Sequence, residues 1–265
     1  MKRPDFAVPI GLVVGLAAIG VSARLEGVRL GFLWQPTAAI VVLGGTLGAV
    51  IVRRGLGGLW SATRAMLSLG TRESNDELEA SVARLAWLAR AVKREGVQVL
   101  EGHAESSDDP LLAQGLKLAA DYTDPITVRA ALGRQLEQEY TVGMRDVTTL
   151  DAAGGYAPTF GILGAVLGLI QVLRALTEPH ALGTGIATAF VATIYGVGLA
   201  NLVLFPLAAR LRDRLDHRIR QRETLVEAIA ALAAHEPPGA ITRRVAPNAW
   251  LDTQTALLKL PKLAP

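Results

Sequence analysis

The stretch of sequence that decides the fold runs from Gly154 to Pro206. Residues 154–173 read GGYAPTFGILGAVLGLIQVL, and residues 186–206 read IATAFVATIYGVGLANLVLFP. Both segments are uncharged and rich in Gly, Ala and Thr, and each contains one proline. Helices that only face lipid need nothing but apolar side chains, whereas small side chains allow transmembrane helices to approach each other closely. The pattern predicts two membrane-spanning helices that pack tightly against other helices.

The composition of the whole chain also indicates a membrane protein. Hydrophobic residues make up 51% of the 265 residues, and the mean hydropathy is +0.34, which is too apolar for an ordinary soluble domain. Two more uncharged segments, the 18 residues Phe6–Ala23 and the 20 residues Leu33–Val52, are about long enough to cross a bilayer. Together with Gly154–Leu173 and Ile186–Leu207, they predict four transmembrane helices in two hairpins.

The first apolar segment has an alternative interpretation as a secretory signal peptide. Lys2 and Arg3 precede it, and Val21-Ser22-Ala23 resembles a cleavage site. However, the segment is long for a signal peptide, its glycines suit a packing helix, and the second span begins only nine residues later. A membrane hairpin is therefore the favoured interpretation.

The distribution of Lys and Arg predicts the orientation in the membrane. The connections Arg24–Phe32 and Arg174–Gly185 contain two and one basic residues, whereas residues 53–150 contain twelve and six arginines lie between Arg210 and Arg222. We therefore expect both termini and the middle segment in the cytoplasm. The pI of 9.4 does not point to nucleic acid, because the basic excess follows the last span, where anionic lipid headgroups are the simpler partner.

The segments outside the spans are predicted to be helical, so the expected fold class is an all-α membrane protein. Residues 53–153 form a cytoplasmic helical domain, and residues 208–265 form a helical extension of the fourth span followed by a tail. Helices are predicted over Asp76–Arg94, Val97–Glu101 and Leu111–Ala120, and from Asp124 into the third span. Pro237-Pro238-Gly239 ends the extension near Ala234. The leucines between Leu251 and Leu260 suit either a short docking helix or a disordered tail.

None of the four predicted spans contains Asp, Glu, Lys, Arg or His. Ionisable side chains at membrane depth are costly and usually mark an ion pathway. If this chain conducts protons, the carboxylate must therefore come from a partner, and otherwise it is a structural or signalling membrane protein. The chain has no cysteine, and GLGG at residues 55–58 lacks the lysine of a nucleotide-binding loop, so neither thiolate metal sites nor an enzyme is predicted.

Thr193 is a candidate site residue within the fourth span. With Ala189, Gly196 and Ala200 it is predicted to lie on one stripe of the helix, because the intervals are four, three and four residues. A threonine there can offer its hydroxyl to water or to a carboxylate. The alternative is a bond back to the backbone carbonyl four residues earlier.

Pro158 and Pro206 each remove a backbone donor and weaken the helix locally. One interpretation is that they mark span boundaries, and the other is that they act as hinges between the membrane helices and the cytoplasmic domain. Trp34, Trp60 and Tyr156 are placed to act as interfacial anchors.

Three motifs of two glycines separated by three residues recur in the predicted spans. They begin at Gly11, Gly44 and Gly164. Such motifs permit close helix approach, and together they favour an oligomer over a lone hairpin.

Four blocks resemble the MotA family, the membrane subunits of the bacterial flagellar motor stator. They are GGYAPTFGILGAVLGLI, ATAFVATIYGVGLANLVLFPLA, QPTAAIVVLGGTLGA and KREGVQVLE. The resemblance extends from about Phe6 to His235 and includes the order of the elements. It is strongest in the last hairpin, which is typical of the wider MotA/TolQ/ExbB group, whereas the initial hairpin separates MotA from the three-span TolQ/ExbB branch.

The resemblance implies a stator subunit of the inner membrane that couples ion flow to torque. It implies a ring of five such chains around two copies of a MotB-like partner, which spans the membrane once, carries an ion-binding Asp and anchors to peptidoglycan. It also implies that the ring pushes the rotor protein FliG. No cofactor or metal is expected besides the transported ion.

The resemblance also assigns roles to single residues. Pro158 and Pro206 match the two family prolines that couple ion flow to torque, and Thr193 matches the hydroxyl beside the ion path. Sodium-driven relatives carry a threonine where this sequence has Ala165. Because sodium needs several oxygen ligands and a proton needs only one acceptor, the expected ion is H⁺.

The rotor-facing charges of the family are an arginine and a glutamate, which map to Lys93 and Glu101. Lysine keeps the sign but loses the bidentate fork of arginine, and Arg94 could substitute for it. The alternative for each residue is an ordinary solvated surface charge.

Two other functions remain open on the sequence. The first is a TolQ/ExbB-like energiser of a periplasmic partner, which a neighbouring gene for a TonB-like or TolR-like protein would favour. The second is a membrane scaffold that conducts no ions.

Overall fold

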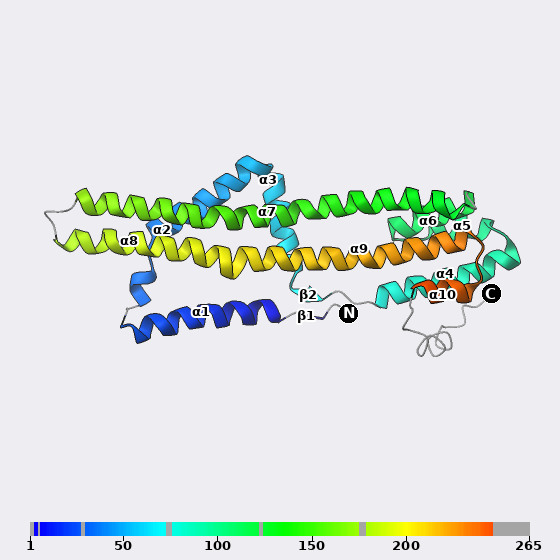
Figure 1. The fold of residues 1–265 in the computed structure, drawn as a ribbon, viewed down its shortest axis with the longest axis horizontal. Helices are drawn as coiled ribbons and strands as arrows, with labels where there is room; N and C mark the ends of the chain where they lie inside the picture. Colours follow the sequence, from blue (N-terminus) through cyan, green and yellow to red (C-terminus); the bar gives the residue numbers. More distant parts are fainter. Residues whose placement is uncertain are drawn as a thin grey trace. The chain divides into compact units, whose positions relative to one another are not determined.

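The computed structural model describes residues 3–4, 6–27, 30–72, 76–121, 124–174 and 179–245. These residues are almost entirely helical (Figure 1). The exception is a two-residue antiparallel pairing of β1 (Arg3–Pro4) with β2 (Thr71–Arg72). Four helices are long and apolar enough to cross a membrane. The predicted all-α membrane fold with four spans is confirmed.

The chain forms two compact units, which are described separately. The first comprises residues 1–73 and 142–214, and the second comprises residues 74–141 and 215–265. The first unit extends beyond the predicted spans, because Ala62 is buried against Leu150 and Ala208. The predicted limits of the cytoplasmic domain, residues 53–153, stay a prediction.

The first hairpin of the first unit contains one loosely packed helix and one irregular helix. Its elements are α1 (Ala7–Leu25), the 3₁₀ helix η1 (Leu30–Leu33), α2 (Pro36–Ala39), the π-helix η2 (Ile40–Gly44) and α3 (Gly45–Ser68). Pro36 occupies the first turn of α2, where its missing N–H costs no hydrogen bond. Gly55 kinks α3 with a φ of 70°, a conformation that glycine adopts without strain. No residue of α1 is buried.

The second hairpin contains the two longest helical runs. Its elements are α7 (Pro125–Arg174), α8 (Pro179–Gly198), the π-helix η3 (Leu199–Leu204) and α9 (Phe205–Ala233). Residues of α7 and α9 belong to both compact units. The expectation that the helix beginning near Asp124 runs into the third span, and that the fourth span continues as a helix to about residue 234, is confirmed.

Backbone-to-backbone contact holds α7 and α8 together, and the two helices lie side by side in Figure 1. A Cβ atom at Gly196 would lie 2.5 Å from the carbonyl oxygen of Ala157 and 3.0 Å from the Cα of Gly161. A Cβ at Gly168 would lie 2.7 Å from the backbone nitrogen of Ala189. Real side chains do not tolerate these distances, so glycine is required for this helix spacing.

The glycine motifs behave differently from one another. Gly164 and Gly168 are buried in the α7–α8 contact, as the motif predicts. Gly11, Gly44 and Gly48 face open space within this chain, whereas Gly15, the second glycine of the first motif, approaches the side chain of Leu202. Gly45, the neighbour of Gly44, makes a close contact instead, because the ring of Phe160 packs against its backbone.

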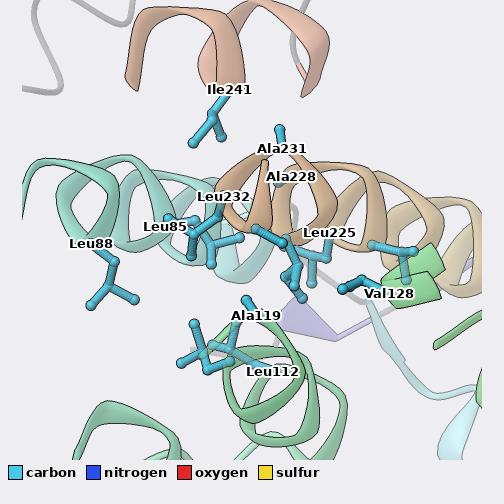
Figure 2. Packing of buried hydrophobic residues seen from close by; sticks show 14 of the residues in the cluster. Leu85, Leu88, Leu112, Ala119, Val128, Leu225, Ala228, Ala231, Leu232 and Ile241 are labelled. Carbon is cyan, nitrogen blue, oxygen red and sulfur yellow. The ribbon is translucent and has the colours of Figure 1, made fainter. Parts of the chain in front are cut away.

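The second unit is a helical bundle around an apolar core (Figure 2). Its elements are α4 (Asp76–Glu95), α5 (Gln98–Glu105), α6 (Pro110–Asp121), residues 125–141 of α7, residues 215–233 of α9, and α10 (Pro238–Val245). Leu85, Leu112, Leu225 and Ile241 from four of these helices meet in the core. Gly96, with φ 89°, ends α4 as predicted.

Two predictions for this unit need correction. The helix expected over Val97–Glu101 extends to Glu105. The break at Pro237–Gly239 is shorter than expected, because Pro238 is itself the first residue of α10, and Ile241 anchors that helix in the core. The docking helix expected between Leu251 and Leu260 lies outside the described residues.

Charged groups fix the ends of the helices in the second unit. Arg222 on α9 bonds Glu139 at 2.9 Å and Asp109 at 3.5 Å. Asp124 caps α7 by accepting bonds from the Thr127 hydroxyl and from the backbone N–H groups of Ile126 and Thr127. These bonds, the Thr127 hydroxyl first, lower the pKa of the Asp124 carboxyl below its ordinary value.

We predict that Gly196→Ala destabilises the protein by about 1–3 kcal/mol, because the added methyl group overpacks the backbone of α7. The matched control is Gly183→Ala on the same helix, where a Cβ meets nothing within 4 Å. It should be neutral or slightly stabilising, since alanine is the better helix former. Thermal unfolding in one detergent compares the two variants, and equal midpoints would contradict the close contact.

Candidate functional site

The two candidate prolines lie inside continuous helical runs. Pro158 lies within α7 at the closest approach to α8, where a Cβ at Gly196 would be 3.1 Å from the Pro158 Cα. Pro206 is the second residue of α9 and directly follows the π-helix η3. Neither proline ends a helix, so each is a local weak point within a helical run. π-helical turns often occur at functional sites, and η3 adds a second irregularity beside Pro206.

Thr193 lies on the outer side of α8. Ala189, Gly196 and Ala200 are buried, whereas Thr193, on the same stripe by helical spacing, is exposed, although its Cα lies 3.4 Å from where a Cβ at Gly161 of α7 would be. The reason is that the contact with α7 centres on Ala192, whose carbonyl oxygen and Cβ approach the α7 glycines. Thr193 therefore lies at the edge of the buried face, with its backbone near α7 and its side chain exposed.

The Thr193 hydroxyl makes the local bond that was considered as an alternative. Its Oγ1 donates to the backbone carbonyl of Ala189 at 3.4 Å. This distance is at the long end for a hydroxyl bond, so the bond is weak and the oxygen still has lone pairs to offer. Both interpretations of Thr193 are therefore compatible with its geometry.

Two further polar groups share this exposed setting, and the sequence reasoning missed them. Thr159 follows Pro158 and bonds its own helix at the Tyr156 carbonyl, 2.6 Å away. Asn201 lies in η3 and donates to the Val197 carbonyl at 3.0 Å. The spacing of Thr193, Val197 and Asn201 by four residues is the signal that could have revealed this face. Exposed amides and hydroxyls are unfavourable against lipid, so this face suits contact with another protein chain or with water.

Ala165 lies beside the close helix contact. It is half-buried and follows Gly164, which packs against the Ala192 Cβ. A methyl group at this position supplies no oxygen ligand to the outer face of α7.

A polar cluster joins the first hairpin to α8, and the sequence reasoning did not find it. The Tyr195 hydroxyl donates to the Leu33 carbonyl and accepts a 3.4 Å bond from the backbone N–H of Gln35. The Thr188 hydroxyl donates to the Gln35 side-chain oxygen at 3.4 Å. These bonds hold α8 against the start of α2, two residues from Thr193.

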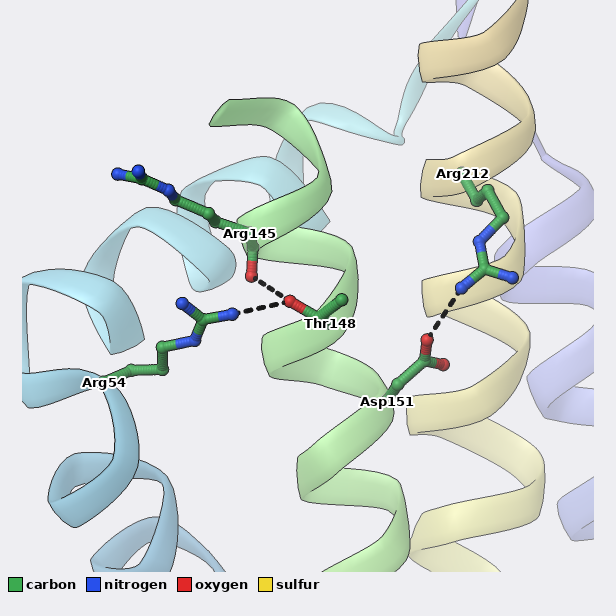
Figure 3. Close-up of polar contacts among 5 residues, drawn as sticks. All are labelled: Arg54, Arg145, Thr148, Asp151 and Arg212. Atoms are coloured by element: carbon green, nitrogen blue, oxygen red, sulfur yellow. Dashed lines mark hydrogen bonds and ion pairs between the residues drawn. The ribbon is translucent and has the colours of Figure 1, made fainter. Parts of the chain in front are cut away.

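A second polar cluster lies beyond the apolar segments, where α3, α7 and α9 meet (Figure 3). Arg54 donates to the Thr148 hydroxyl at 2.7 Å, and that hydroxyl donates to the Arg145 carbonyl at 3.0 Å. Asp151 pairs with Arg212 at 3.1 Å. The pair is nearly half exposed, so it adds at most about 1 kcal/mol to stability and mainly orients the two helices.

No group of three or more His, Asp or Glu side chains that could hold a metal ion occurs in the described part of the chain. The apolar segments of all four candidate spans also lack ionisable side chains. The geometry therefore provides a tightly packed hairpin with an outward polar face and no titrating group of its own at membrane depth.

Comparison with known proteins identifies the family. Residues 103–224 match the model of the MotA/TolQ/ExbB proton channel family. The chain is 30% identical to motility protein A of Aquifex aeolicus over 247 residues, which cover 91% of this chain and 95% of that protein. It is 27% identical to motility protein A of Bacillus subtilis over 236 residues, or 89% and 87% of the two chains. The chain belongs to the motility protein A family.

The structural comparison agrees with this assignment. The flagellar MotAB stator complex from Bacillus subtilis contains a chain that is similar to this MotA-family protein, with a TM-score of 0.81 and 26% identity. The match covers 96% of this chain and 99% of that chain. The two membrane hairpins and the helical second unit therefore lie within the shared fold.

The residues expected to face the rotor lie in the second unit of this MotA-family chain. Lys93 and Arg94 are exposed in the last turn of α4, and Glu101 is exposed in the first turn of α5. The left-handed turn at Gly96 separates them, and Trp87 packs edge-on against His103 at 5.3 Å beneath this corner. Their role in rotor contact stays a prediction.

We predict that Tyr195→Phe destabilises the MotA-family chain by about 1–3 kcal/mol, because the Leu33 carbonyl and the Gln35 N–H lose a buried partner. The matched control is Tyr156→Phe, since the Tyr156 hydroxyl bonds to nothing among the described residues. Chemical or thermal unfolding in detergent measures both variants. A Tyr195→Phe variant as stable as the control would show that the polar cluster does not hold α8 to the first hairpin.

Proposed function

We propose that this chain is the membrane subunit of a flagellar stator, which couples ion flow across the bacterial inner membrane to torque on the rotor. The observation that supports this most is the match over nearly the whole chain to motility protein A relatives and to a MotAB stator complex. A torque generator of this kind needs no catalytic site, because the membrane potential supplies about 2.3 kcal/mol per charge per 100 mV.

The partner is a MotB-type subunit that spans the membrane once and carries the ion-binding Asp. Two features of this chain support that assignment. Its spans contain no ionisable side chain, and Thr159, Thr193 and Asn201 are exposed along α7, α8 and η3. A partner carboxylate facing these groups would accept hydrogen bonds from the threonine hydroxyls of this chain. Five copies of this chain around two partner chains complete the proposed assembly.

Torque transmission begins where the helices are weakest. A proton binds the partner carboxylate beside Thr193 and is later released, which changes the charge facing α7 and α8. Pro158 and Pro206 each lack one backbone bond, so α7 and the run from α8 to α9 bend there first. Because α7 and α9 contribute residues to both units, bending at the prolines moves the second unit.

The transported ion is H⁺, and the supporting residue is Ala165. A sodium ion in a protein site needs several oxygen ligands, whereas a proton needs a single acceptor. The alanine methyl group removes one ligand that a threonine would supply next to the buried Gly164. The partner carboxylate and the Thr193 hydroxyl are enough for a proton.

Both termini and the second unit lie in the cytoplasm, where the rotor is. The supporting observation is the basic excess of residues 53–150 and 208–222 over the two short connections. Lys93, Arg94 and Glu101 at the α4–α5 corner then meet charged residues of the rotor protein FliG. Each exposed pair is worth about 1 kcal/mol or less, so several pairs act together.

We predict that replacing the membrane Asp of the MotB-type partner with Asn abolishes swimming while flagella still assemble. The reason is that asparagine cannot bind and release a proton. The test expresses both subunits in a strain that lacks its own stators, with wild-type partner as the control. A non-conducting scaffold would leave swimming unchanged. If swimming survives protonophores but requires external sodium, the H⁺ assignment is wrong.

We predict that Lys93→Glu combined with Arg94→Glu lowers the equilibrium constant for binding to the rotor about fivefold. The reason is that two surface ion pairs of roughly 0.5 kcal/mol each are lost. Stall torque of tethered cells measures the effect. Lys117→Glu is the control, since Lys117 is an exposed lysine on α6. Equal torque in both variants would remove these two residues from the rotor contact.

A further inference from the structure

An apolar groove in the first unit lies between α1, the helix formed by α2 and η2, and the α8–η3 run. Its volume is about 570 Å³, within the usual range of small-ligand sites. Leu, Ile, Val, Ala and Gly make up nearly all of its wall, and only Trp34 and Tyr195 bring polar atoms. The Tyr195 hydroxyl is already bonded to backbone groups, so the groove offers almost purely hydrocarbon contacts.

Missing side chains and a loosely attached helix create the groove. Gly20 on α1 and Gly198 on α8 both line it, and a Cβ on either residue would meet nothing within 4 Å. No residue of α1 is buried, and Gly15 of α1 approaches Leu202 of η3. The helix therefore stands apart from its neighbours along much of its length.

The position of the groove determines what fills it. Its lining residues belong to three of the four helical runs that are apolar enough to cross a membrane, or to η1 and Trp34 beside the second. The surrounding solvent at this depth is hydrocarbon, and an empty groove would forfeit the dispersion contacts of its walls. From Leu12 to Gly20 the groove follows α1 for about 12 Å, at 1.5 Å per residue. A single acyl chain fits this length and this wall.

One end of the groove suits a phosphate headgroup. Arg24 lies one turn beyond Gly20 in the last turn of α1, and Trp34 is 79% exposed at the same end. Tryptophan prefers the membrane interface, and a guanidinium binds phosphate oxygens with two parallel bonds. Glu26 is close in sequence, but residues 24–32 contain two arginines and one glutamate, so the net charge of this connection is positive.

We propose that this groove binds one acyl chain of a membrane glycerophospholipid, whose phosphate is held by Arg24 beside Trp34. The chain runs along α1 toward Leu12 and completes the contact between α1 and the rest of the unit. Because Leu199, Leu202 and Val203 of η3 line the groove, the lipid contacts the π-helix that precedes Pro206. The proposal does not depend on the motor function.

Photolabelling of the complex with its MotB-type partner tests the proposal. The complex is placed in phosphatidylglycerol nanodiscs that contain a trace of phospholipid with a diazirine on one acyl chain. Mass spectrometry of its peptides then locates the labels. We expect labels at Leu16, Leu43 and Leu199. Equally strong labels at Val14, which is exposed and does not line the groove, would mean bulk lipid only and overturn the proposal.

Two groove-filling variants provide an independent measurement. Gly20→Leu and Gly198→Leu each place a side chain where the structure has room. Groove labelling should fall about tenfold, the factor expected when roughly two buried CH₂ groups lose their contacts. Gly11→Leu is the matched control on α1, because Gly11 also faces open space but does not line the groove. Equal labelling in all three variants would overturn the proposal. If a variant fails to assemble, the labelling of the wild-type complex still tests the proposal.

The headgroup and the rival occupant are tested separately. Arg24→Gln should weaken labelling by the diazirine phospholipid but not by a diazirine diacylglycerol, which lacks the phosphate. Equal effects on both probes would overturn the headgroup placement. A photoreactive amino acid in place of Leu43 should give no crosslink to a second copy of the chain. Efficient crosslinking would show that a protein chain fills the groove, which contradicts the lipid.

Discussion

The structure of the membrane unit depends on one contact, the backbone approach of α7 and α8 at Gly161 and Gly196. Each helix presents glycine at this point, and a Cβ at Gly196 would lie 2.5 Å from the Ala157 oxygen. The contact places Pro158 and Thr193 on touching helices within one turn of each other. It also turns Thr193 outward, because Ala192 takes the central position against α7. Side chains larger than hydrogen at the two glycines would separate the proline from the hydroxyl.

This arrangement explains why the chain resembles a channel and yet lacks the group that a proton channel requires. Three exposed polar side chains, Thr193, Thr159 and Asn201, each donate to a carbonyl of their own helix, and the Thr193 bond is the longest. Such groups are polar enough to line a path but cannot exchange a proton at neutral pH. In the proposed function the carboxylate therefore comes from the partner, and this chain supplies the helices that surround it.

The length and class of the helices could be predicted from the sequence, because charge-free segments, glycine turns and prolines act locally. The continuous α7 and the end of α4 at Gly96 are examples. Which residues of a helix lie on its buried face was less predictable. Helical periodicity placed Thr193 on one stripe with Ala189, Gly196 and Ala200, but it could not show that Ala192 would be buried and Thr193 exposed. The glycine motif pointed to Gly44, whereas its neighbour Gly45 makes the close contact with Phe160, and the cause of this error is the same.

Contacts between distant segments were not predictable from one sequence. The Tyr195–Leu33 bond, the Arg54–Thr148 bond and the docking of α10 through Ile241 join residues far apart in the chain. No periodicity or motif marks them, because each depends on how the helices pack. The contact of Ala62 with Leu150 and Ala208 is a further example.

The most direct test of the account is proton uptake by liposomes that contain this chain alone, under an imposed membrane potential. The account predicts uptake no faster than in empty liposomes, because the chain has no titrating side chain at membrane depth. Uptake should become faster only when the MotB-type partner with its Asp is reconstituted with it. Proton uptake by the chain alone would contradict the claim that the helices around the ion path and the carboxylate that binds the proton lie on separate chains.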